Sequence, residues 1–122
     1  MKIDDSIREK KRKELAEKFI SEVSEVSPAF SKHFSCFWKD KRCGGAMQDK
    51  DRELLMLLAG LVDNCEPCVR FHMANAMKQG AAEAEIFETI SVAVVMCSDP
   101  NIHEHVKYCL SIYEKFKKNL IK

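Results

Sequence analysis

The apolar run LLMLLAGLV at residues 54–62 constrains the fold of this chain more than any other feature. Read as a helix, it is apolar on every side, whereas a helix at a protein surface keeps one polar face. Such a helix is surrounded by protein, so we expect it in the middle of the fold. The rest of the chain must then supply elements that pack around it.

The hydrophobic period is helical nearly throughout, and only three prolines and four glycines interrupt it. We expect helices over about residues 7–24, 28–38 and 82–97, one that Asp49 begins, one between Asn64 and Gly80, and one from Asp99-Pro100 to the C-terminus. No strand pattern, internal repeat or second domain is evident. The sequence therefore predicts an all-α, single-domain helical bundle of about six helices over residues 1–122.

Short polar residues and glycine mark the ends of several of these helices. Ser6, with Glu9 three positions later, predicts a capping box. Ser27-Pro28 has the pattern of an N-cap followed by proline in the first turn. Asn64 is a favourable N-cap residue, and Gly80 lies where a helix would end in the left-handed conformation.

Charge and composition exclude several classes of function. The net charge is +1, so no overall field attracts nucleic acid or anionic lipid. The basic run at residues 8–13 has acidic neighbours and reads as a solvated helix face. No apolar stretch approaches the roughly 18 residues that span a bilayer. We therefore expect neither a nucleic-acid partner nor a membrane.

The N-terminus lacks the apolar region of a secretory signal, which predicts a cytoplasmic protein. Thiols there stay reduced unless they are catalytic or bound to metal. Six cysteines are many for 122 residues in that compartment. Their even number does not by itself indicate a structural disulfide framework.

The segment NCEPCVRFHM, residues 64–73, contains the most informative cysteines. On a helix, Cys65, Cys68 and His72 fall within about 60° of arc on one face. A thiol in the first turn lies at the positive end of the helix dipole, which favours the thiolate. His72 could exchange a proton with Cys68, since an imidazole titrates near neutrality. The three residues are therefore candidates for a redox site.

Glu53 is the polar partner that His72 requires on an otherwise buried face. The helices before and after Asn64 are joined by almost no loop, so they should pack as an antiparallel hairpin. Measured from that turn, Glu53 lies about 16 Å back and His72 about 12 Å forward. Gly60, on the same face as Glu53, would let the two backbones approach closely. A chain Glu53–His72–Cys68 is geometrically reasonable, directly or through water.

Two other interpretations of the cysteine pair remain open at this point. Cys65, Cys68 and His72 could be three zinc ligands, with a fourth from Cys36, Cys43, Cys97, His103 or His105. Against zinc, His103 and His105 are two residues apart and face different sides of a helix. The cysteines could also merely fill the core, His72 could be a satisfied core histidine, and Glu53 a carboxylate favoured by the helix dipole.

The pattern Glu53, Cys65-x-x-Cys68, His72 and Gly80 resembles the AhpD-like alkylhydroperoxidase family, within the carboxymuconolactone decarboxylase superfamily. The resemblance covers roughly residues 49–97. It implies an all-helical homo-oligomer, commonly a trimer or hexamer, that acts as a thiol peroxidase or disulfide reductase without flavin, haem or nucleotide. The decarboxylase branch lacks the cysteine pair, so the resemblance does not favour decarboxylase activity.

In the scheme that the resemblance implies, Cys68 attacks an organic hydroperoxide or a small disulfide. Cys65 resolves the product and meets the external reductant, a dithiol protein or a lipoyl-type donor. His72 and Glu53 relay the proton. No metal takes part.

The sequence also departs from AhpD itself. Pro67 stands where AhpD has a histidine before the second cysteine, so a relay that needs two histidines cannot operate. The small polar cap expected after Gly80 is replaced by Ala81-Ala82. We expect the general peroxide and disulfide chemistry to apply, with Met73, Met77 and the leucines of residues 54–62 lining an apolar approach. We assign no role to four cysteines: Cys36, Cys43, Cys97 and Cys109.

Overall fold

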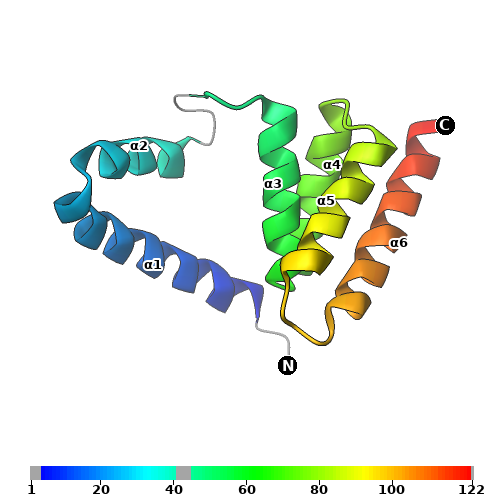
Figure 1. The fold of residues 1–122 in the computed structure, drawn as a ribbon, viewed down its shortest axis with the longest axis horizontal. Helices are drawn as coiled ribbons and strands as arrows, with labels where there is room; N and C mark the ends of the chain where they lie inside the picture. The colour runs from blue at the N-terminus through cyan, green and yellow to red at the C-terminus, as the bar shows by residue number, and fades with distance from the viewer. Residues whose placement is uncertain (1–3, 41–44, 122) are drawn as a thin grey trace. The chain divides into compact units, whose positions relative to one another are not determined.

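The computed structural model describes residues 4–40 and 45–121, with the side chains of residues 120 and 121 left aside. These residues form helices and no strand (Figure 1). The six helices are α1 (Asp5–Val26), α2 (Pro28–Lys39), α3 (Asp49–Val62), α4 (Glu66–Lys78), α5 (Glu83–Met96) and α6 (Ile102–Ile121). The predicted all-α class and helix number are confirmed.

The chain divides into two compact units, Met1–Ala46 and Met47–Lys122. In the first unit α1 packs against α2, and in the second α3 to α6 pack together. Within the part that the structure describes, no helix is both long enough and apolar enough to cross a membrane. The single domain expected over residues 1–122 stays a prediction.

In the second unit, helix α3 packs against α4, α5 and α6 (Figure 1). Leu57 and Leu61 of this helix are completely or almost completely buried, at 0% and 1% exposed. The predicted burial of the apolar helix is therefore confirmed for one side only. Its enclosure is incomplete, because three neighbours cannot surround a helix: Leu55 is 51% exposed and Val62 is 39% exposed.

The connection between α3 and α4 is a tight turn in which Asn64 takes a left-handed conformation, with φ of 50°. The Asn64 N–H donates to the carbonyl of Leu61, and the Cys65 N–H donates to the carbonyl of Gly60. This pair of bonds is the Schellman motif that ends many helices. Asn64 therefore ends α3, and the predicted N-cap of α4 is wrong by one residue: Cys65 occupies that position.

Helix α4 ends in the same way at Gly80, whose φ is 87°. The Gly80 N–H donates to the Met77 carbonyl, and the Ala81 N–H donates to the Ala76 carbonyl. Glycine accepts this conformation without a steric penalty, so the predicted helix end is confirmed. The next helix starts without a polar cap residue.

Two predicted helix starts are shifted, and one is confirmed. Ser27 caps α2, with its hydroxyl accepting the Phe30 N–H at 3.2 Å. Helix α1 is capped by Asp4, whose carboxylate accepts the Ser6 N–H, so Ser6 lies inside the helix. Aspartate and serine are equally good N-cap residues, and a cap at Asp4 makes the helix longer than a cap at Ser6 would. Asp49 is the first residue of α3 and follows the actual cap position.

Candidate active site

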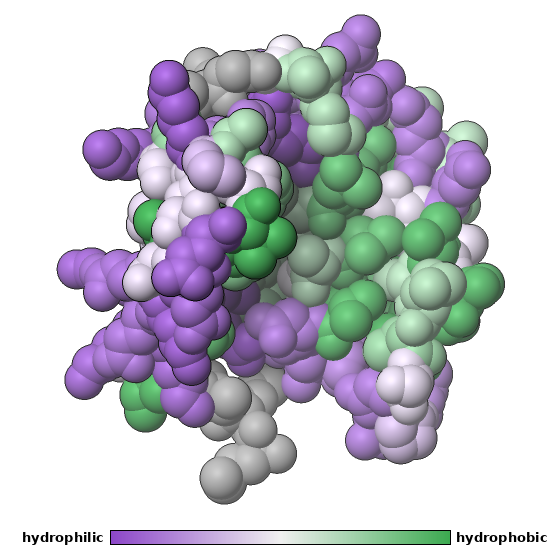
Figure 2. Space-filling model, turned by 60° about the vertical axis from the view of Figure 1, so that its left-hand side comes forward, coloured by the Kyte–Doolittle hydropathy of each residue, from purple (hydrophilic) through white to green (hydrophobic). Residues whose placement is uncertain are grey.

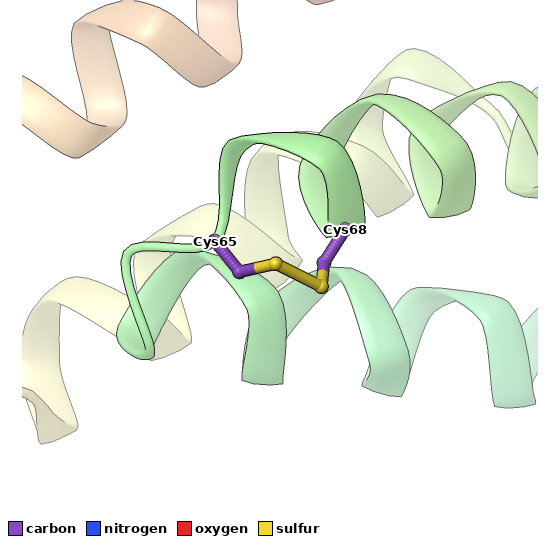
Figure 3. Close-up of a disulfide and its surroundings, with 2 residues drawn as sticks. All are labelled: Cys65 and Cys68. Carbon is purple, nitrogen blue, oxygen red and sulfur yellow. A yellow bond between two sulfur atoms is a disulfide. The ribbon is translucent and has the colours of Figure 1, made fainter. Parts of the chain in front are cut away.

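Cys65 and Cys68 are joined by a disulfide at the start of α4 (Figure 3). Cys65 is the N-cap residue, and Cys68 lies in the first turn, with the two Cα atoms 5.2 Å apart. A spacing of three residues at a helix start brings the two sulfurs to the same side. The cysteine pair can therefore form the bridged state that a dithiol redox cycle requires.

The two cysteines differ in their access to solvent. Cys65 is 2% exposed, whereas Cys68 is partly exposed. The backbone of Cys65 is held on both sides: its N–H donates to Gly60 at 2.9 Å, and its carbonyl accepts the N–H of Val69 at 3.0 Å. Cys65 thus belongs to the junction of α3 and α4, while Cys68 lies nearer the surface.

Gly60 allows α3 to pass close behind Cys68. A Cβ atom at position 60 would lie 2.9 Å from the Cβ of Cys68 and 3.5 Å from its carbonyl carbon. The first distance is shorter than the 3.5 to 4.0 Å at which carbon atoms make favourable contact. The close approach predicted for Gly60 is confirmed, and it fixes the distance between the helices at the cysteine pair.

His72 and Glu53 form the hydrogen-bonded pair that the helical hairpin predicts. The His72 Nδ1 atom lies 2.6 Å from Glu53 Oε2, and both side chains are 20% exposed. With the carboxylate as acceptor, Nδ1 donates, which leaves Nε2 as the nitrogen that can take up a proton. His72 lies one helical turn after Cys68 on the same face. The Glu53–His72 hydrogen bond therefore lies one turn along α4 from Cys68.

The apolar surroundings of this site differ from those expected. Met73 is 0% exposed and belongs to the core, so it cannot line an approach from solvent. Phe71 is 62% exposed instead, and its ring meets the His72 ring edge-on at a centroid distance of 5.1 Å. Sequence analysis missed Phe71 because position 71 is about 100° away from His72 around the helix.

The positions of the possible zinc ligands do not favour a metal site. Cys65 and Cys68 are bonded to each other. Among the residues that the structure describes, no group of three or more histidine, cysteine or acidic side chains could hold a metal ion. His103 and His105 point to different sides of α6, as expected, with side chains 62% and 10% exposed. The zinc interpretation therefore has no assembled ligand set in this part of the chain.

The other described cysteines are not part of this disulfide. Cys97 and Cys109 are free thiols, the first partly exposed and the second buried. Burial raises the pKa of the Cys109 thiol to about 12, which suppresses its thiolate. Cys36 is disulfide-bonded, although the sequence indicated no role for it. Cys43 lies outside the described residues.

Comparison with known proteins extends the resemblance seen in the motif. The sequence profile of the carboxymuconolactone decarboxylase family matches residues 28–108, which is wider than the core of residues 49–97 expected from the motif. The match therefore includes the residues of α2 and part of α6. No curated protein is similar enough to this chain to count as a match.

Two crystal structures of a Thermotoga maritima protein of this family resemble the chain. One, for which a role in the antioxidative response has been suggested, is 26% identical, with a TM-score of 0.60 over 84% of this chain and 87% of that one. The other is 29% identical, with a TM-score of 0.57 over 88% and 90% of the chains.

A family protein from Legionella pneumophila, 24% identical, shares the fold with a TM-score of 0.57 over 81% of this chain and 88% of that chain. The fold and the profile match agree. The chain belongs to the carboxymuconolactone decarboxylase family.

Proposed function

We propose that this protein is a thiol-dependent peroxidase or disulfide oxidoreductase that cycles Cys65 and Cys68 between dithiol and disulfide. The observation that carries the proposal is the Cys65–Cys68 bond one turn before a histidine held by a carboxylate. Thiol–disulfide exchange requires a second thiol within reach, and proton transfer requires an acid–base group close to the sulfur. The site has both.

The oxidative half of the cycle has two steps. The Cys68 thiolate attacks the terminal oxygen of an organic hydroperoxide, the O–O bond breaks, and the products are Cys68 sulfenic acid and an alkoxide that takes up a proton to become the alcohol. The Cys65 thiol then attacks the Cys68 sulfur, forming the disulfide and releasing water. A dithiol donor finally returns two electrons and two protons to the pair.

His72 and Glu53 supply the proton steps in this proposal. His72 Nε2 accepts the proton of the Cys68 thiol and returns it to the leaving alkoxide, while Glu53 orients the ring through Nδ1. The exposed ring of Phe71 beside His72 supports an organic rather than a purely polar substrate. The role suggested for the Thermotoga maritima relative in the antioxidative response is consistent with peroxide chemistry.

We also propose a homo-oligomer, in which subunits cover the outer side of α5. Val95 and Met96 are 80% and 77% exposed, and the visible face of the molecule carries a broad area of hydrophobic residues (Figure 2). Patches of this kind are typical of protein–protein contacts. Sedimentation velocity tests the proposal, and a monomer at all concentrations contradicts it. The cytoplasmic location expected from the sequence stays a prediction.

Steady-state turnover of cumene hydroperoxide with dithiothreitol tests the enzymatic proposal. We expect Cys68→Ser to abolish turnover. Reduced Cys65→Ser, freed of dithiothreitol, should consume about one equivalent of peroxide and then stall, because it has no resolving thiol. Cys97→Ser is the matched control, because it removes a partly exposed thiol elsewhere and should leave the rate unchanged. Retention of steady-state turnover in Cys68→Ser would refute the assignment of the nucleophile.

A further inference from the structure

The two sulfurs of the disulfide are not equivalent targets for an incoming thiol. Thiol–disulfide exchange requires the attacking thiolate to approach the sulfur it bonds to, so access decides which sulfur is attacked. Cys65 is 2% exposed, whereas Cys68 is partly exposed, as are the neighbouring side chains of His72 and Glu53, each 20% exposed. Cys68 is therefore the more exposed cysteine of the pair, and it lies one helical turn before His72.

Two backbone hydrogen bonds hold Cys65 in its buried position. Its N–H completes the Schellman motif that ends α3, and its carbonyl accepts the first intrahelical hydrogen bond of α4, from Val69. Asn64, with φ of 50°, holds the chain reversal between these bonds. Moving the Cys65 backbone outward would break these hydrogen bonds, so we expect a dithiol donor to reach Cys68 more readily than Cys65.

We propose, building on the redox function above, that the reductant attacks the sulfur of Cys68 and that Cys65 is the leaving group. This reverses the scheme that the family resemblance implies, in which Cys65 meets the external reductant. The substrate of this half-reaction is a dithiol, either a protein with a cysteine pair or a small dithiol. Cys65 then serves only the intramolecular steps.

The position of Cys65 suits a leaving thiolate. As the N-cap residue of α4, Cys65 lies at the positive end of the helix dipole. This position stabilises the negative charge that develops on the Cys65 sulfur when the S–S bond breaks. Attack at the other sulfur would place that charge on Cys68, farther along the helix.

The exchange balances as two thiol–disulfide steps. The donor thiolate bonds to the Cys68 sulfur, the Cys65–Cys68 bond breaks, and the electron pair stays on Cys65, which takes up a proton. The second donor thiolate attacks the donor's own sulfur in the mixed disulfide. It forms the donor disulfide and releases Cys68 as the thiolate that begins the next oxidation. Oxidant and reductant therefore use the same sulfur in turn.

Mapping the first mixed disulfide tests the inference directly. Oxidised full-length protein is mixed briefly with glutathione as the probe and quenched in acid. It is then unfolded, alkylated with N-ethylmaleimide and digested with trypsin. Fragmentation at the Glu66–Pro67 bond in tandem mass spectrometry separates the two cysteines. We expect glutathione on Cys68 and maleimide on Cys65 in at least tenfold excess over the reverse isomer.

The same reaction in urea is the control, because unfolding removes the difference in access and should bring the two isomers to comparable amounts. Glutathione mainly on Cys65, an equal mixture in the folded protein, or no adduct at all would each overturn the inference. The map does not depend on peroxide turnover. If glutathione is found on Cys68 but the protein does not turn over peroxide, the result counts against the proposed function alone. If the protein turns over peroxide but glutathione is found on Cys65, the result counts against this inference alone.

Discussion

Replacement of Gly60 by alanine tests the close packing of α3 against the cysteine pair. The added methyl carbon would lie 2.9 Å from the Cβ of Cys68, an atom attached to backbone that cannot rotate away. Helix backbone must then shift by several tenths of an ångström, and overpacking of this kind costs about 1–3 kcal/mol. Alanine is favoured over glycine inside a helix by about 1 kcal/mol. We expect a net loss of about 1 kcal/mol in the free energy of unfolding.

A double-mutant cycle separates the two effects. In a Cys68→Gly background the offending Cβ is absent, and the remaining contacts, at 3.5 Å to the carbonyl carbon of residue 68 and the nitrogen of Val69, are ordinary. Gly60→Ala should therefore stabilise this background by about 1 kcal/mol through helix propensity. The sign of the effect reverses between the two backgrounds, which gives a coupling energy of about 2 kcal/mol.

Urea unfolding of all four proteins under reducing conditions measures this cycle, because reduction removes the disulfide from the comparison. Stabilisation by Gly60→Ala of about 1 kcal/mol in both backgrounds would refute the reasoning. In that case the helices would not be in the close contact described at the cysteine pair.

Three further predictions concern single side chains. Glu53→Gln removes the charge beside His72 but keeps a hydrogen-bonding group. It should lower peroxide turnover at least tenfold and leave the urea midpoint nearly unchanged. A large fall in the urea midpoint together with the loss of turnover would indicate a structural role. The Glu83 carboxylate accepts the Tyr113 hydroxyl at 2.6 Å, and this bond together with Lys117 lowers the pKa of Glu83 from its ordinary 4.5. A lowered folded-state pKa stabilises the fold above pH 4.5, and this stability is lost as pH falls through the folded pKa. Tyr113→Phe should therefore reduce the urea midpoint at pH 7 and much less at pH 3, and an equal reduction at both would contradict the charge-assisted bond. The buried Cys109 thiol, with its pKa raised to about 12, should resist iodoacetamide at pH 8 until the protein unfolds; rapid native labelling by mass spectrometry would contradict its burial.

The sequence predicted those parts of the site that depend on helix geometry alone. Glu53 and His72 meet because a hairpin with almost no loop fixes which turns of the two helices lie opposite each other. Gly60 predicted the close approach of the α3 and α4 backbones for a similar reason. Residue spacing was sufficient in both cases, since no other element had to be placed first.

The parts that sequence analysis missed depend on how elements pack. Asparagine is favoured both as an N-cap and as a left-handed residue after a helix, so composition could not decide between these roles for Asn64. The unequal exposure of Cys65 and Cys68 follows from where α3 ends, which no local pattern specifies. Met73 lies about 100° around α4 from His72, on the side that packs into the core, and the sequence pattern did not separate these two sides.

The turn at Asn64 gives this site a mechanical property. Cys65 makes both the hydrogen bond that ends α3 and the hydrogen bond that begins α4. These bonds hold the main chain around the cysteines without the disulfide. We therefore expect that making or breaking the bridge moves little besides the side chains of the pair. On this expectation, a partner distinguishes the oxidised from the reduced protein by reacting with it and not by recognising a changed surface.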